Sequence, residues 1–320
     1  MIDVTRKDHM IKRFKDLLKL KELSIIIFVA IILLLFSIFI DRFYSLKNFE
    51  IISRQISAVG IISLGMTLVI FSGGIDLSVG AILSFAINIG GMGIVANWPI
   101  WIVYPVILFL GVLLGLVNGV LVANLGVPAI IITLGTMNIF RGITMVITKG
   151  IYITPIPSSY EVIGQGFTPF IIFIVVLIVF IIINKKLRFG RNLLAIGGNE
   201  TSALYSGVPV KQFKIRAYMI SGLLSALAGL ILVGKSGFVQ PQAGMGYEMT
   251  AITAVMIGGT SIFGGSGTVI GTFFGSIFLG LILAGLTMIA VNPYWLGMIQ
   301  GLLIIIAITL DSLRHFKNNR

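Results

Sequence analysis

Residues 23–40 read LSIIIFVAIILLLFSIFI, an apolar run of 18 residues without a charged side chain. An α-helix rises about 1.5 Å per residue, so a run of this length crosses most of a ~30 Å hydrocarbon core. The run exceeds the ~7–15-residue core of a signal peptide, and no small-x-small cleavage site follows it. The sequence therefore predicts a retained membrane-spanning helix near the start of the chain.

The rest of the chain has a similar composition. Of its 320 residues, 57% are hydrophobic and 11% are charged, against roughly 25% charged residues in soluble domains. Further apolar runs predict nine more spans, at 54–72, 77–96, 99–123, 127–148, 167–184, 215–234, 249–263, 267–290 and 293–311. The run at 249–263 is short, which favours a broken or re-entrant helix. We expect an all-α polytopic membrane protein with about ten transmembrane helices, in a single domain over 23–320.

The basic residues predict how the chain is oriented. Seven of the 23 Lys and Arg residues precede residue 22, seven lie between Lys185 and Arg216, and three follow Asp311. Basic residues concentrate in short cytoplasmic loops beside helix ends. With ten spans, this places 1–22, 184–214 and 312–320 in the cytoplasm, together with both termini. The same clustering accounts for the net charge of +12 without nucleic acid as a partner.

Segment 1–22 allows two interpretations. Its apolar residues recur at helical spacing, so it could lie along membrane lipid at the inner surface, or it could be a solvated extension of the first span.

The composition argues against metal sites and thiol chemistry. The chain has no cysteine, and its two histidines, His9 and His315, stand at opposite ends. We therefore expect no disulfide, no metal site and no catalytic residue.

Asp76 is the carboxylate that the sequence places at membrane depth, in the segment Ser72-Gly-Gly-Ile-Asp-Leu-Ser-Val-Gly80. Burying a charge there costs roughly 2.5–3.5 kcal/mol even on insertion scales, so we expect a specific reason for it. As the N-cap of the following helix, Asp76 would accept unpaired amide protons. Direct contact with a solute or ion is the alternative, and the two roles are compatible.

A second segment with local signals lies in the 184–214 loop. Asn199 can cap a short helix, Glu200 suits its positive end, Gly207 favours a left-handed stop, and Pro209 prevents continuation. A helix this short is unstable alone, because isolated helices need about 12–15 residues. It must therefore pack on its own transmembrane helices or dock on a partner protein.

Glycine-rich segments elsewhere predict close packing. Residues Gly259 to Ser266 have the spacing of a phosphate-binding loop, but Gly265 stands where the phosphate-binding Lys is required. The chain is therefore not expected to bind ATP. Gly111, Gly115 and Gly119, spaced by four, predict a helix-packing face.

Polar residues at membrane depth are the remaining candidates for a solute route. Asn118 and Asn138 could hydrogen-bond a neutral polyol, as could Asn88 and Gln300, although such amides often bond neighbouring helices instead. Arg141 is the best single candidate because Asn138 lies one turn before it on the same face. Snorkelling of Arg141 to the interface is the alternative.

Three motifs together carry a resemblance. The segment at 73–80, Ile196-Gly-Gly-Asn-Glu200 with its loop to Gly207, and Gly258-Gly-Thr-Ser-Ile-Phe-Gly-Gly265 look like the ribose-type permease subunits of bacterial ABC importers. The likeness extends over nearly all of the chain after the N-terminal extension. One departure is local: the general permease loop has Glu-Ala-Ala, three residues and Gly, whereas here Glu200-Thr-Ser is followed by four residues before Gly207.

The resemblance implies a ten-helix subunit in the bacterial inner membrane. Its implied partners are a second permease subunit, identical or related, two cytoplasmic ATPase subunits that bind the ATP, and an extracytoplasmic binding protein that delivers a sugar such as ribose. It also implies that the helix from Asn199 to Gly207, with Glu200, Ala203 and Leu204, couples the chain to the ATPase.

Other solutes and one other class of transporter stay open. Related permeases carry nucleosides, branched-chain amino acids or signalling molecules. An ion-coupled secondary transporter would require intramembrane acid pairs, but no carboxylate lies between Glu248 and Asp311. We expect Glu248 itself at the external edge.

Overall fold

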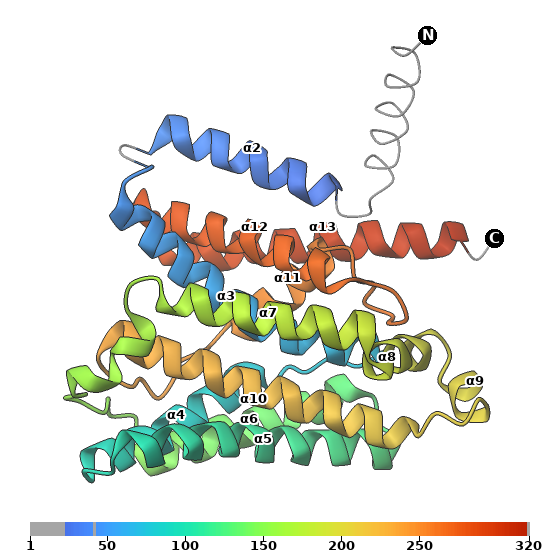
Figure 1. Cartoon of the computed structure of the whole chain (residues 1–320), viewed down its shortest axis with the longest axis horizontal. Helices are drawn as coiled ribbons and strands as arrows, with labels where there is room; N and C mark the ends of the chain where they lie inside the picture. Colours follow the sequence, from blue (N-terminus) through green and yellow to red (C-terminus); the bar gives the residue numbers. More distant parts are fainter. Residues whose placement is uncertain (1–22, 41–42, 319–320) are drawn as a thin grey trace.

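The computed structural model describes residues 23–40 and 43–318, and the predicted cytoplasmic segment 1–22 lies outside this range. The described residues form an all-helical bundle, joined by loops that hold two short 3-10 turns and one isolated β-bridge (Figure 1). The helices are α2 (Leu23–Phe39), α3 (Leu46–Phe71), α4 (Val79–Val95), α5 (Ile100–Leu125), α6 (Ala129–Thr148), α7 (Thr168–Lys186), α8 (Arg188–Gly198), α9 (Glu200–Tyr205), α10 (Val210–Ser236), α11 (Tyr247–Ile257), α12 (Val269–Met288) and α13 (Pro293–Asn318). The 3-10 turns are η1 (Ser158–Tyr160) and η2 (Val162–Gly164).

Six of these helices are long and apolar enough to cross a membrane: α3, α5, α6, α7, α10 and α12. Shorter apolar helices, α2, α4, α11 and part of α13, overlap the other four predicted spans. The all-α polytopic membrane fold is thereby confirmed. The helix predicted to be short is short, because α11 has 11 residues and gives way to a glycine-rich loop. The start of α3 differs from the prediction of 54–72, since the helix begins at Leu46 and includes Lys47 and Glu50, charged residues that lie before the apolar window.

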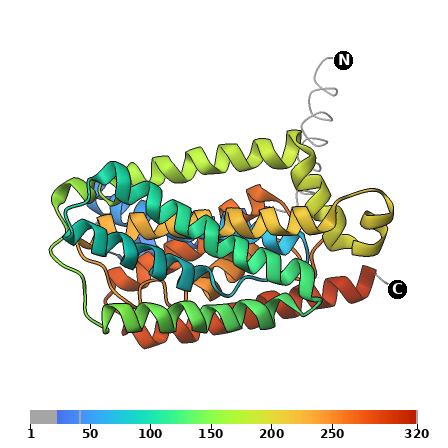
Figure 2. The ribbon, with the colours of Figure 1, turned by 90° about the horizontal axis from the view of Figure 1, so that it is seen from below.

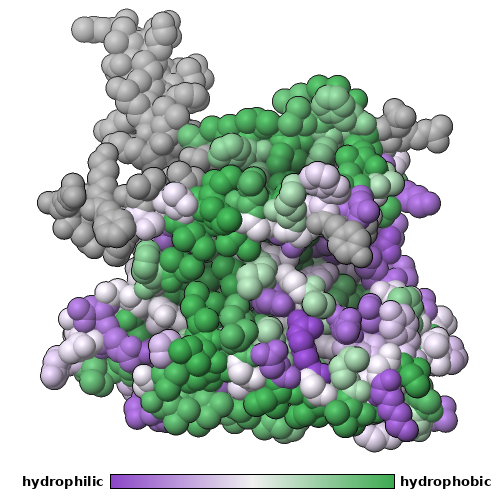
Figure 3. Space-filling view, turned by 180° about the vertical axis from the view of Figure 1, so that it is seen from behind, coloured by the Kyte–Doolittle hydropathy of each residue, from purple (hydrophilic) through white to green (hydrophobic). Residues whose placement is uncertain are grey.

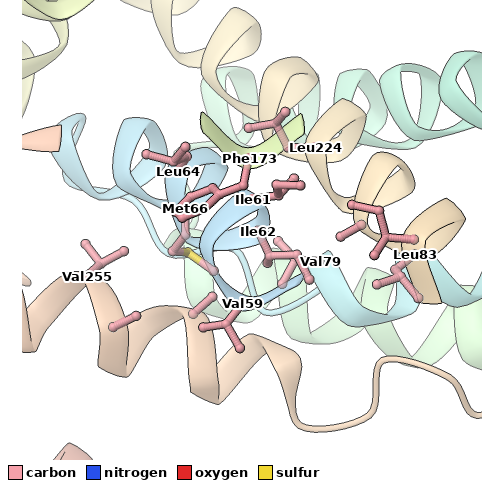
Figure 4. Packing of buried hydrophobic residues seen from close by; sticks show 14 of the residues in the cluster. Val59, Ile61, Ile62, Leu64, Met66, Val79, Leu83, Phe173, Leu224 and Val255 are labelled. Carbon is pink, nitrogen blue, oxygen red and sulfur yellow. The ribbon is translucent and has the colours of Figure 1, made fainter. Parts of the chain in front are cut away.

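Helix α3 occupies the centre of the bundle. It contacts α7, α10, α11 and α12, and its residues from Ile56 to Phe71 are all buried. Figure 4 shows Ile61, Leu64 and Met66 of α3 among side chains of α4, α7, α10 and α11. The hydroxyls of Ser57, Ser63 and Thr67 donate to backbone carbonyls one turn earlier, and such bonds satisfy polar groups where water is absent.

The outer helices have a different surface. In α6 and α7, only 22% of the most apolar 18-residue window is buried, compared with 89% in α3. Large apolar side chains such as Phe109, Val146 and Ile171 are therefore exposed, and hydrophobic residues cover broad areas of the face in Figure 3. This apolar exterior is the lipid boundary expected of a polytopic membrane protein.

The pairing of α5 with α10 confirms the predicted glycine face. The two helices lie side by side (Figure 2), and Gly111, Gly115 and Gly119 of α5 face the backbone of α10. A Cβ at any of the three would overlap α10 main-chain atoms, at Gly222, Tyr218 and Ile215 respectively. Glycine is required here because the backbones approach this closely.

Candidate functional site

Asp76 lies in the non-helical segment between α3 and α4 and is fully buried. Its Oδ1 accepts hydrogen bonds from the Ser78 amide (2.9 Å) and the Ser78 hydroxyl (2.6 Å). Its Oδ2 accepts one from the Ser221 hydroxyl of α10 (3.3 Å). The prediction that Asp76 is the N-cap of the following helix is wrong: the N-cap of α4 is Ser78, and Asp76 lies two residues earlier, where its carboxylate accepts the Ser78 amide instead of an amide of α4 itself.

Asn118 joins the same cluster. Its amide nitrogen donates to the Ser78 hydroxyl (2.6 Å), while its Oδ1 is buried and has no partner among the described residues. The Tyr218 hydroxyl is likewise buried and unpartnered, and the Thr133 hydroxyl of α6 donates to the Ile75 carbonyl (3.1 Å). Segments from α3 to α6 and α10 thus place several polar groups around Asp76, and two of those groups retain hydrogen-bonding capacity. We call Asp76, Ser78, Asn118, Tyr218 and Ser221 the Asp76 cluster.

Arg141 lies elsewhere, in an ion pair with Glu248 of α11. The distance from the Arg141 guanidinium to Glu248 Oε1 is 3.5 Å, and the same oxygen accepts the Gly246 amide (3.3 Å). Glu248 Oε2 is buried without a partner among the described residues. Asn138 is exposed, whereas Arg141 is half-buried toward α11. Three residues along a helix leave two side chains about 60° apart, so Asn138 and Arg141 share a broad face of α6, but only Arg141 contacts α11 through Glu248.

Two of the remaining amides bond their neighbours. Asn88 donates to the carbonyls of Ser84 (2.8 Å) and Gln240 (3.3 Å), and Gln300 donates to the Thr250 hydroxyl (3.0 Å). The Gln300 contact links α13 to α11, as predicted for an intramembrane amide, whereas Asn88 bonds its own helix and the segment between α10 and α11.

The predicted short helix of the 184–214 loop is present as α9. The Asn199 side chain accepts the Ser202 amide (2.8 Å), and Gly207 has a φ of +81°, so both predicted ends are confirmed. Ala203 is buried, while Leu204 is 58% exposed on a helix that extends from the end of the bundle (Figure 1). Glu200 pairs with Lys214 of α10 at 2.6 Å. Helix α8, which precedes α9, was not predicted.

The three sequence motifs meet at the base of this loop. A Cβ on Gly197 of α8 would overlap the Phe71 carbonyl oxygen and the Gly265 amide nitrogen. Gly264, at φ +85°, lies against Gly73, and the Gly265 amide donates to the Phe71 carbonyl (3.3 Å). We call Gly73, Gly197, Gly264 and Gly265 the glycine junction. It confirms that the loop at 258–268 uses glycine for close backbone contact.

The same loop is fixed from its other side by α13. Asp311 Oδ2 accepts hydrogen bonds from the Ser261 hydroxyl and the Ile262 amide, both at 3.0 Å.

The described residues contain no group of three or more His, Cys, Asp or Glu residues that could hold a metal ion. Sequence reasoning missed Tyr218, Ser221 and the partner of Arg141, because their roles arise from contacts between distant helices and leave no local signal.

Comparisons with known proteins agree with this architecture. The family model described as branched-chain amino acid transport system / permease component matches residues 48–308. A ribose import permease protein of Haemophilus influenzae is 40% identical, covering 91% of both chains. A galactose/methyl galactoside import permease protein of Escherichia coli is 37% identical over 93% of this chain and 96% of its own. An autoinducer 2 import system permease protein of Photorhabdus luminescens is 32% identical over 91% and 90%.

No solved structure matches the chain. The family match covers most of the helical bundle, including the Asp76 cluster, α9 and the glycine junction. The chain therefore belongs to the branched-chain amino acid transport system permease family, as a non-enzymatic permease component of an ABC transporter.

Proposed function

We propose that this chain is the transmembrane permease subunit of an ATP-driven importer for a small neutral solute, a monosaccharide such as ribose. The observation that carries the proposal is the glycine junction, which joins the base of α9 directly to the segment that precedes Asp76. A displacement of α9 would be transmitted to the Asp76 cluster through these backbone contacts. The ribose and galactose permeases among the relatives favour a sugar over a charged solute.

The proposed subunit is a single transmembrane domain over 23–320, in the bacterial inner membrane, with ten spans and both termini cytoplasmic. The position of α9 supports this orientation, because α9 lies at the same end of the bundle as the C-terminal end of α13 (Figure 1). The basic residues of 184–214 and 312–320 would then be on one side, as the charge rule requires.

The proposed partners divide the work of transport. Two cytoplasmic ATPase subunits bind ATP and receive the coupling surface of Asn199, Glu200, Ala203, Leu204 and Gly207. An extracytoplasmic protein delivers the solute at the opposite end. The exposure of Leu204 and Tyr205 supports a docked partner, since α9 offers apolar side chains away from its own bundle.

The proposed route uses Asp76, Asn118, Asn138 and Arg141. Asp76 and Asn118 are supported by their common buried cluster, and Arg141 by its position on a pair that links α6 to α11. Asn138 would be on the route if a second permease subunit, identical or related, packs on α6. Gly135 and Gly142 support that packing, because a Cβ on either would meet no atom of the described residues within 4 Å.

Reconstitution tests the function. Proteoliposomes containing this chain, the ATPase subunits encoded with it and the matching binding protein should accumulate labelled ribose only when ATP is supplied to the ATPase side. Liposomes that lack the ATPase should accumulate none. Labelled galactose and autoinducer 2, offered in parallel, identify the solute. Uptake by this chain alone, driven by a sodium or proton gradient, would contradict the importer.

A further inference from the structure

A cavity of about 360 Å³ lies at the α9 end of the bundle. The end of α3 forms one wall, at Ser72–Gly74, and the turn between α5 and α6 forms another, at 122–129. Glu200 and Lys214 stand on its lining, and Tyr218 of α10 completes it. The volume falls within the range of about 300–1,000 Å³ that small-molecule sites occupy.

Tyr218 gives this cavity a hydrogen-bonding group without a protein partner. The side chain is fully buried, and its hydroxyl has no hydrogen bond among the described residues. The hydroxyl lies near Gly74, where a Cβ would be only 2.7 Å from its oxygen. A buried hydroxyl is normally paired, because an unpaired one loses its hydrogen bonds to water without replacement. A ligand in the cavity would supply that partner.

The charges of the lining favour a neutral ligand. Glu200 and Lys214 neutralise one another at 2.6 Å, and the nearby Asp76 already accepts three hydrogen bonds. The remaining lining includes a polar residue, Ser72, and apolar residues such as Val122 and Val127. A sugar has hydroxyls for the first and C–H faces for the second.

We propose that this cavity is a binding site for a neutral polyol of pentose or hexose size, open to the cytoplasm. The inference rests on the orientation given under the proposed function. An occupant lies beside the Glu200–Lys214 pair, which ties the first residue of α9 to α10, so occupancy acts on the base of the coupling helix. The polyol has two possible sources: the transported solute as it leaves, or the same class of molecule accumulated in the cytoplasm.

Cysteine protection tests the site, because the chain has no native cysteine. Val127→Cys, on the exposed part of the lining, is labelled in everted membrane vesicles with an impermeant maleimide. D-ribose or D-galactose added at the cytoplasmic face should slow this labelling severalfold. Thr201→Cys, which is exposed on α9 outside the cavity, should be unaffected. Ala123→Cys, a second lining position, provides an independent measurement if Val127→Cys is poorly expressed.

Tyr218→Phe, combined with Val127→Cys, removes the hydroxyl and keeps the ring. The sugar concentration for half-protection should then rise about tenfold, as expected for one lost hydrogen bond. Equal protection with and without the hydroxyl would overturn the site, as would the absence of protection in every arm.

The arms also separate the two sources and the two proposals. Protection in vesicles with the permease alone identifies a cytoplasmic polyol, whereas protection only during ATP-driven uptake through the binding protein identifies the departing solute. ATP-driven uptake by Val127→Cys without any protection refutes the site and leaves the importer standing. Protection without ATP-driven uptake in the wild-type reconstitution refutes the importer and leaves the site standing.

Discussion

Asp76 shows how a buried carboxylate can be stabilised by three donors from its own chain. Asp76→Ala would leave the Ser78 amide and the Ser221 hydroxyl without their acceptor, at a cost of about 1–3 kcal/mol. Asp76→Asn keeps one acceptor oxygen and should lose less. We expect the thermal unfolding midpoint in detergent to fall in the order wild type, Asn, Ala. Ser225→Ala is the control, because that hydroxyl donates only to its own helix, at Ser221; equal midpoints for the Asn and Ala variants would contradict the hydrogen-bonding account.

The Arg141–Glu248 pair predicts a second residue-level result. Arg141→Ala leaves Glu248 buried without its counter-charge. The expected loss is on the order of 1–3 kcal/mol, below the ~3–5 kcal/mol of fully buried pairs, because the Arg141 side chain is 20% exposed. The double variant Arg141→Ala, Glu248→Gln removes the stranded charge and should recover part of the unfolding midpoint. The single variant Glu248→Gln completes the comparison. If the loss of stability in the double variant equals the sum of the losses in the two single variants, the pair is not coupled.

At this scale, the sequence alone identifies buried polar residues whose signal is local. A lone carboxylate in an apolar sequence marks Asp76 by its energetic cost, and an amide at membrane depth marks Asn118. Nothing local could assign Glu248 to Arg141, because the two residues are 107 positions apart and meet only when α6 packs near α11. The exposure of Asn138 was missed for the same reason, since the face that α6 turns inward is set by its neighbours.

At the scale of the elements, the glycine junction predicts that substitutions at two adjacent glycines, Gly197 and Gly198, have different effects on transport. At Gly197 an added Cβ would overlap the Phe71 carbonyl, whereas an added Cβ at Gly198 would be in ordinary contact with the Gly265 Cα, 3.9 Å away. Both glycines belong to α8, so helix propensity changes equally in the two variants. Gly197→Ala should abolish ATP-driven uptake in the reconstituted system, and Gly198→Ala should retain it. Equal uptake by the two variants would show that the junction transmits nothing.

The end of α9 predicts a result that depends on the backbone alone. An added Cβ at Gly207 would meet no atom within 4 Å in the part of the chain that the structure describes, so the restriction there comes from the φ of +81°. Gly207→Val should cost about 1–3 kcal/mol of local strain, whereas Asn tolerates this conformation. We expect the Val variant to reach the membrane normally but to retain the ATPase poorly in a detergent pull-down, and the Asn variant to retain it. Full ATPase retention by Gly207→Val would remove α9 from the coupling surface.

The elements divide into those with and without signals of their own. Caps and apolar runs are local, so α9 and the long spans were predicted. Helix α8 was missed because it has no apolar run long enough to mark it. The meeting of the three glycine motifs was also beyond prediction, since sequence shows that glycine is needed but not which backbone approaches it.

For the whole molecule, we predict that the two ends of the bundle are accessible from opposite sides of the membrane. Ser158 lies in η1, at the end opposite α9 (Figure 1). A cysteine introduced at Thr201 should react with an impermeant thiol reagent only in everted vesicles. A cysteine at Ser158 should react only in cells whose outer membrane is permeabilised and whose inner membrane is intact. The absence of native cysteine makes the unmodified chain the blank. Labelling of Thr201→Cys from outside would overturn the ten-span orientation.

Helices α7, α10, α11 and α12, which pack on the central helix α3, are all synthesised after it. Its partner α12 begins at Val269, so at a synthesis rate of ~5–20 residues per second the ribosome needs roughly 10–40 s after finishing α3 to reach it. During that interval α3 lies in the bilayer without the helix that later covers it. The hydroxyls of Ser57, Ser63 and Thr67 are already bonded within α3 itself, so lipid does not have to solvate them. Helix α3 can therefore lie in the membrane before α7, α10, α11 and α12 are synthesised.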